Sequence, residues 1–118
     1  MTETLRVLIV DDNAGMRRTI RDVLEDLGPE VDECGDGDEV LARFEAFAPD
    51  WVLMDVRMAR VDGIAATAAL RKAHPEARVI MVSDHDQEDV RRAADRAGAV
   101  GYVAKRDLLE LPRLLREG

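Results

Sequence analysis

The chain has 118 residues, of which 47% are hydrophobic and 36% are charged, so we expect one globular domain with a single core. The formal net charge of −8 argues against a nucleic-acid-binding surface, because phosphate binding needs a basic footprint. The single cysteine, Cys34, excludes an internal disulfide and is typical of a reducing compartment. Because no apolar run approaches membrane-spanning length and the first residues lack signal-peptide features, we expect a cytoplasmic protein with no membrane contact.

Predicted strands and helices alternate along the chain. Short apolar or alternating runs, bounded by turn residues, predict strands at 5–10, 30–34, 51–54, 77–82 and 100–103. Apolar residues at helical spacing predict helices at 14–27, 40–47, 64–73, 84–97 and from 108 onward. Asn13 can cap the first helix, and Gly28-Pro29 stops it.

This alternation predicts the α/β class, with one domain over residues 1–118. Strands separated by helices form a parallel sheet, and right-handed crossovers leave few topologies. We expect a flavodoxin-like, doubly wound, five-stranded parallel sheet with strand order 2-1-3-4-5 and helices on both faces.

Polar residues follow the predicted strands where each one leaves the core. Asp11 and Asp12 end the first strand, and Asp55 ends the central one. Ser83 follows the fourth strand, and Lys105 lies just after the fifth. Aspartate at a strand end is often only a turn residue. The predicted order, however, brings all of these residues to one end of the sheet, where open α/β sheets bind ligands.

Three carboxylates in one small pocket repel each other unless protons or a cation intervene. Oxygen ligands without His or Cys suit Mg²⁺, which usually binds one or two carboxylates together with a phosphate. A lysine and a hydroxyl stabilise the charge of a transferring phosphoryl group. A carboxylate can itself act as the nucleophile, and Asp55, alone at the tip of the central strand, is the best candidate.

These residues belong to a set of motifs distributed along the chain. The motifs are Val10-Asp11-Asp12-Asn13, Leu53-Met54-Asp55-Val56-Arg57-Met58, Asp62-Gly63, Val82-Ser83, Gly98-Ala99, and Tyr102 three residues before Lys105. With this spacing the whole chain resembles the receiver domain of two-component response regulators, close to the chemotaxis regulators. That family shares the strand order above, so the resemblance and the expected topology are not independent.

The resemblance implies a role for each acid. Asp55 would accept a phosphoryl group from a sensor histidine kinase or a phosphotransfer protein. Asp12 would bind Mg²⁺ directly and Asp11 through water, while Arg57 would offer its backbone carbonyl. The domain would be a signalling phosphoacceptor that catalyses its own phosphorylation and dephosphorylation, rather than an enzyme with a separate substrate.

The resemblance also implies a switch. Ser83 and Lys105 would bind the phosphoryl oxygens, and Tyr102 would turn inward as Ser83 moves. The signal would pass to an output domain or a target protein, or to a phosphorylation-dependent homodimer, without direct contact with nucleic acid. The sequence leaves open whether the chain acts alone or is part of a longer protein.

The sequence departs from the family pattern at two loops. Proline usually stands where Ala59 is, and proline, often after a cis bond, usually stands where Arg106 is. Because a cis bond before a non-proline residue costs about 2.5–4 kcal/mol, we expect the Lys105–Arg106 bond to be trans or strained.

Other interpretations remain. A phosphatase of the haloacid-dehalogenase type also uses a strand-end aspartate, but needs a second one where Arg57 stands. A phosphorylation-independent interaction module on the same fold would lack a pocket residue, and none is missing. Arg17, Arg18 and Arg21 on the first helix form either a solvated face or a kinase-docking surface.

Overall fold

The computed structural model describes residues 4–84 and 87–117. It contains a five-stranded sheet with the order β2-β1-β3-β4-β5, in which all neighbouring strands are parallel. The strands are β1 (Arg6–Val10), β2 (Glu30–Cys34), β3 (Trp51–Met54), β4 (Val79–Ser83) and β5 (Gly101–Ala104). The predicted fold class and strand order are therefore confirmed.

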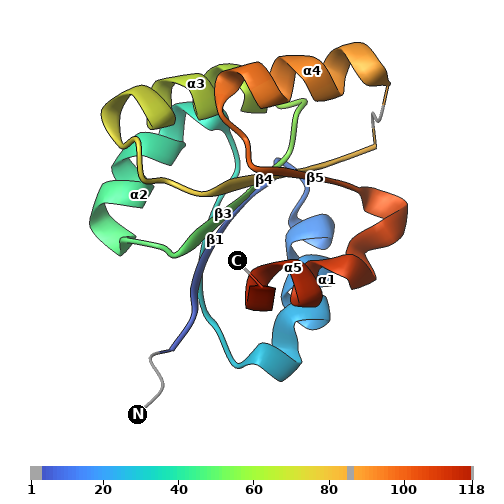
Figure 1. Ribbon diagram of the computed structural model, residues 1–118. Coiled ribbons are helices and arrows are strands. Elements are labelled where there is room, and N and C mark those ends of the chain that lie inside the picture. Colours follow the sequence, from blue (N-terminus) through green and yellow to red (C-terminus); the bar gives the residue numbers. More distant parts are fainter. Residues whose placement is uncertain (1–3, 85–86, 118) are drawn as a thin grey trace.

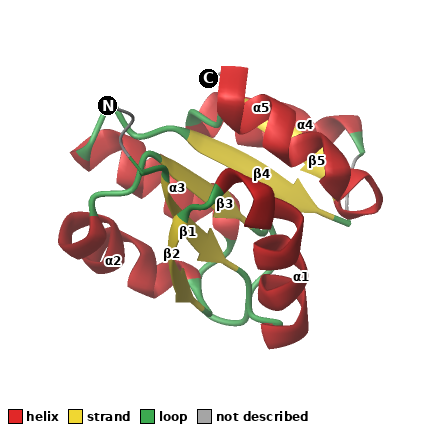
Figure 2. Cartoon of the chain, turned by 90° about the horizontal axis from the view of Figure 1, so that it is seen from below, coloured by secondary structure: helices red, strands yellow, loops and turns green. Residues whose placement is uncertain are grey.

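Helices cover both faces of this sheet (Figures 1 and 2). They are α1 (Ala14–Leu24), α2 (Val40–Phe47), α3 (Gly63–Ala73), α4 (Glu88–Ala97) and α5 (Leu111–Glu117). Short 3₁₀ turns occupy Glu25–Leu27, Gly37–Glu39 and Lys105–Glu110. Helices α1 and α5 lie on one face, and α2, α3 and α4 lie on the other. None of the helices within the described ranges has the length and apolar character needed to cross a bilayer.

The sheet has a core on each face because alternate residues of a strand point to opposite sides. In β1, Leu8 and Val10 pack towards α2, α3 and α4, whereas Val7 and Ile9 pack towards α1 and α5. All four of these side chains are buried. Burial on both faces is typical of a central parallel strand, and it fixes where β1 ends and its acids begin.

Helix termini follow the capping residues. The Asn13 side chain accepts a hydrogen bond from the backbone N–H of Met16 at 2.9 Å, so the predicted cap of α1 is confirmed. The Asp62 side chain caps α3 in the same way, with the Ala65 N–H at 2.8 Å. Helix α2 ends at Phe47 and is followed by its C-cap Ala48, which has a φ of 52° and is the one non-glycine residue with positive φ in the described chain.

Two predicted boundaries on the fourth unit are shifted. Strand β4 begins at Val79 rather than at residue 77, because the Ala77 N–H is used in a turn, where it donates to the His74 carbonyl at 3.0 Å. Helix α4 begins at Glu88 rather than at Asp84. Residues 85–86 of that predicted helix lie outside the described residues.

The final helix also starts later than predicted. Leu108 belongs to a 3₁₀ turn, and α5 begins at Leu111. Pro112 explains the difference, because proline lacks an N–H and is tolerated only in the first turn of an α-helix. No peptide bond in residues 4–84 or 87–117 is cis, so the Lys105–Arg106 bond is trans, as expected.

Candidate functional site

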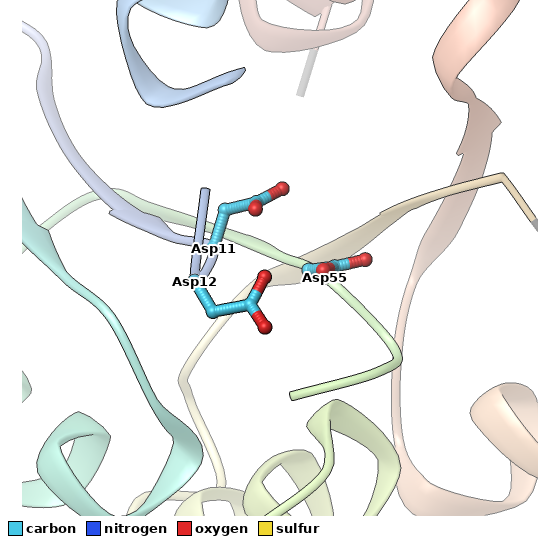
Figure 3. A group of neighbouring side chains, drawn as sticks. All are labelled: Asp11, Asp12 and Asp55. Atoms are coloured by element: carbon cyan, nitrogen blue, oxygen red, sulfur yellow. The ribbon is translucent and has the colours of Figure 1, made fainter. Parts of the chain in front are cut away.

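Three carboxylates meet at the carboxyl end of the sheet. Asp11 and Asp12 follow β1, Asp55 follows the adjacent β3, and one carboxylate oxygen of each lies within 4.8 Å of the others. Figure 3 shows the side chains of Asp12 and Asp55 projecting into the same space from the two strand ends. Asp11 is 1% exposed and Asp55 is 6% exposed, whereas Asp12 is open to solvent. A solute can therefore reach the pocket from the Asp12 side.

Lys105 supplies one positive charge to these acids. It follows β5, and its Nζ lies 3.1 Å from Asp11 Oδ2 and 3.5 Å from Asp55 Oδ1. Burial tends to lower the pKa of Lys105, but the carboxylates of Asp11 and Asp55 outweigh burial and raise it. The ammonium group therefore stays charged at neutral pH, and one cation faces three acids.

Burial and charge both act on Asp55. Desolvation, followed by repulsion from Asp11, raises the pKa of Asp55 from 3.8 to about 6, although Lys105 opposes the shift. Asp12 adds a smaller effect in the same direction as Asp11. Burial is therefore the first cause of the raised pKa of Asp55, and the neighbouring acids add to it.

The Asp11 backbone is held by α1 and β2. Its carbonyl accepts a hydrogen bond from Arg17 Nη1 at 2.6 Å, and its N–H donates to the Cys34 carbonyl at 3.2 Å. Arg17 is itself paired with Glu33 of β2 at 2.7 Å, and Arg21 binds the other oxygen of Glu33. Arg17 is half-buried in this pair, whereas Arg18 and Arg21 are exposed, so the solvated face and the kinase-docking surface both remain predictions.

Sequence reasoning missed this role of Arg17. The Arg17–Glu33 pair joins residues that are 16 positions apart. An i, i+4 charge pattern on one helix cannot reveal such a pair. Only the docking of α1 beside β2 brings the two side chains together.

The loop after Asp55 turns back very closely on itself. The Gly63 N–H donates to the Val56 carbonyl at 2.7 Å, and a Cβ at Gly63 would lie 1.9 Å from the Asp55 carbonyl oxygen. Only glycine leaves room for this approach. Arg57 lies in the same loop with an exposed side chain, one residue beyond the Val56 carbonyl that Gly63 binds.

The remaining predicted residues lie on β4 and β5. Ser83 is fully buried at the end of β4, and its register partner on β5 is Ala104, which precedes Lys105. Tyr102 is half-buried, with the Arg91 guanidinium 4.6 Å from the centre of its ring. The topology thus places a hydroxyl, an ammonium group and three carboxylates at one end of the sheet.

The acids form a donor set that suits a hard cation. They offer only oxygen, and they are the one cluster of three or more metal-ligating side chains in residues 4–84 and 87–117. Asp11 Oδ1 accepts a hydrogen bond from the Asn13 N–H at 2.9 Å. Asp11 Oδ2 is buried and faces the Lys105 ammonium at 3.1 Å. The site therefore fits Mg²⁺.

Comparison with known proteins agrees with this architecture. Residues 7–116 match the family model of the response regulator receiver domain. The chemotaxis protein CheY of Halobacterium salinarum is 37% identical over 100 residues, which cover 85% of this chain and 83% of that protein. A protein-glutamate methylesterase/protein-glutamine glutaminase of Geobacter sulfurreducens is 39% identical over 98% of this chain, but only 33% of that protein is covered.

A solved structure of a response regulator domain has the same fold. The response regulator domain of Thermotoga maritima CheB superimposes with a TM-score of 0.85 at 28% identity, over 98% of this chain and 96% of that domain. The match therefore extends from the sheet to the helices on both of its faces. The chain belongs to the family of response regulator receiver domains.

Proposed function

We propose that residues 1–118 act as one phosphoacceptor unit. Asp55 accepts a phosphoryl group from the phosphohistidine of a sensor histidine kinase or phosphotransfer protein, in a Mg²⁺-dependent reaction. The observation that supports this most strongly is the position of Asp55. It is a buried carboxylate at the tip of the central strand, with a lysine ammonium 3.5 Å away and two further acids beside it.

Asp55 is suited to act as a nucleophile. With a pKa of about 6, it is mostly ionised at neutral pH and yet poorly solvated. One of its oxygens forms a bond to phosphorus as the phosphorus–nitrogen bond of the donor breaks, and the electron pair of that bond leaves with the imidazole. Lys105 and Ser83 bind the phosphoryl oxygens and offset their charge.

The residues that would hold Mg²⁺ are Asp11, Asp12, Asp55 and the backbone carbonyl of Arg57. When bound, Mg²⁺ neutralises the acids and the incoming phosphoryl oxygens. The oxygen-only donor set of the three acids and the raised pKa of Asp55 both favour a cation at this position. Hydrolysis of the aspartyl phosphate by water in the same site would return the domain to its resting state.

The switch involves β4 and β5. Ser83 moves towards the phosphoryl group, and Tyr102 turns inward to fill the space behind it. In the present structure the Arg91 guanidinium lies over the Tyr102 ring, so Arg91 of α4 must release or follow Tyr102. The movement would thus change the exposed charges of α4.

The signal passes to a separate target, to an output domain or to a second copy of the domain. The Geobacter methylesterase, in which the matched region is a third of the protein, illustrates the covalent arrangement. A dimer face on α4 would use the mixed charges of Arg92, Asp95 and Arg96. The domain itself does not bind nucleic acid in this proposal, in keeping with the net charge of −8.

The test is the intact mass of the protein after incubation with acetyl phosphate. The wild type should gain one phosphoryl group with Mg²⁺ and almost none with a chelator, whereas Asp55→Asn should gain none. An adduct on Asp55→Asn would contradict the assignment of Asp55. No adduct on the wild type would favour the phosphorylation-independent interaction module instead.

A further inference from the structure

The segment after β2 is bound to the loop between β3 and α3. The Asp36 carboxylate accepts hydrogen bonds from the backbone N–H groups of Arg60 at 2.9 Å and Val61 at 2.8 Å. The Gly37 N–H donates to the Val61 carbonyl at 3.2 Å. We call these three hydrogen bonds the Asp36 clasp. They join residues that are 24 to 25 positions apart in the chain.

The clasp depends on the residue types that form it. Asp36 is 4% exposed, and loss of its carboxylate would remove the acceptor of two backbone N–H groups in part-buried hydrogen bonds. A Cβ at Gly37 would lie 2.4 Å from the Val61 carbonyl oxygen, so no larger residue allows the same approach. The N–H of Arg60, more than the other backbone donors, lowers the pKa of Asp36, which keeps the carboxylate ionised.

The clasped loop begins at the proposed phosphorylation site. Asp55 and Val56 are fixed at one end by β3 and by the hydrogen bond from Gly63. No proline stands between Val56 and Asp62, so no backbone φ angle in the middle of the loop is fixed covalently. The Asp36 clasp restrains that part of the loop from outside, three to four residues beyond Arg57.

We propose that Asp36 is a positioning residue for the cation site. By holding the backbone of Arg60 and Val61, it keeps the Arg57 backbone in the conformation that serves Mg²⁺ binding beside Asp55. Asp36 itself does not contact the cation or the phosphoryl group. This inference depends on the proposed function, because it concerns the same site.

The test uses Asp36→Ala, Asp36→Asn and, as a matched control, Asp38→Ala. Asp38 lies two residues further on and is exposed; its carboxylate pairs with the Arg60 side chain at 3.2 Å, and its backbone N–H, which Asp38→Ala keeps, donates to Asp36 Oδ1 at 3.5 Å. Removal of the Asp38 carboxylate changes the charge by the same amount without breaking the clasp. Asp36→Asn keeps one oxygen as an acceptor and is the variant to use if Asp36→Ala does not fold.

Two measurements distinguish positioning from general stability. The first is the dissociation constant of Mg²⁺ by calorimetry, which should rise about tenfold in Asp36→Ala, as for other residues that orient metal ligands, and less in Asp36→Asn. The second is amide hydrogen exchange in chelator. Exchange at Arg60 and Val61 should become at least several-fold faster in both Asp36 variants and should remain as in the wild type in Asp38→Ala.

An unchanged Mg²⁺ dissociation constant in folded Asp36→Ala or Asp36→Asn would overturn the inference, even if the melting temperature fell. Equal weakening by Asp38→Ala would also overturn it, because charge alone would then explain the effect. If the wild type bound no Mg²⁺, the proposed function and this inference would fall together. Normal Mg²⁺ binding and phosphorylation in all variants would reject the inference and leave the proposed function intact.

Discussion

The raised pKa of Asp55 makes the stability of the metal-free domain depend on pH. Folding raises the pKa of Asp55 from 3.8 to about 6, so the folded chain binds the proton more tightly than the unfolded chain does. The stability that Asp55 contributes is therefore fully present below pH 3.8 and is lost as the pH rises through about 6. This sign is opposite to that of an aspartate in a simple salt bridge.

The size of the effect follows from the shift. A tenfold change in proton affinity corresponds to about 1.4 kcal/mol, so a rise of the Asp55 pKa from 3.8 to about 6 gives a loss of about 3 kcal/mol between acid and neutral pH. Because Asp55 is 6% exposed, little of this is screened by solvent. Asp55→Asn keeps the shape of the side chain and cannot ionise. At neutral pH it should therefore be more stable than the wild type by an amount of this order.

The assay is urea unfolding in chelator at about pH 4 and about pH 7. At each pH, the free energy of unfolding of Asp55→Asn is compared with that of the wild type. That comparison is needed because the pKa values of Glu33 and Asp36 are lowered, which makes other parts of the molecule more stable as the pH rises. The control is Asp26→Asn, an exposed position outside the pocket. If the free-energy difference between Asp55→Asn and the wild type is the same at both pH values, the reasoning is refuted.

Three further outcomes are expected. Asp12→Asn should raise the melting temperature in chelator and remove most of the stabilisation by Mg²⁺. For the wild type that stabilisation is about 2.7 kcal/mol at a hundredfold excess of Mg²⁺ over its dissociation constant. Equal stabilisation of both proteins by Mg²⁺ would contradict the metal site. Lys105→Ala should still form some aspartyl phosphate but should reduce the phosphorylation-dependent NMR shift at Tyr102, and an unchanged shift would argue against a switch role. Ala48→Gly should stabilise the domain by about 0.5–1 kcal/mol in urea unfolding, because Ala48 has a φ of 52°, whereas lower stability would show that this backbone conformation carries no strain.

Much of the fold was predictable because its signals are local. The buried central strand is a continuous apolar run, and Trp51–Met54 has the predicted boundaries. The half-buried strand Glu30–Cys34 also has the predicted boundaries, although its signal is only the alternation of Val31 and Glu33. The position of each strand end then determined which acids could meet. Once the strand order was chosen, the convergence of Asp11, Asp12 and Asp55 followed.

What the sequence did not reveal is how loops and helices are bound to that sheet. Arg17 contacts the Asp11 carbonyl and Glu33 only because α1 docks beside β2. Asp36 looked like an ordinary turn residue between two glycines, and its partners are backbone N–H groups, which have no sequence signature. The sequence also did not show that the Val61 carbonyl approaches Gly37 too closely for any side chain there. A glycine in a turn usually indicates only that the backbone needs conformational freedom.

The most direct test of the central proposal locates the phosphoryl group on the chain. Wild-type protein incubated with acetyl phosphate and Mg²⁺ would be treated with borohydride, which reduces an aspartyl phosphate to homoserine, and then digested and sequenced by mass spectrometry. We predict homoserine at position 55 and at no other aspartate, dependent on Mg²⁺. Homoserine at Asp11 or Asp12 instead, or none at any position in a protein that gains phosphoryl mass, would contradict the assignment of Asp55 as the phosphoacceptor.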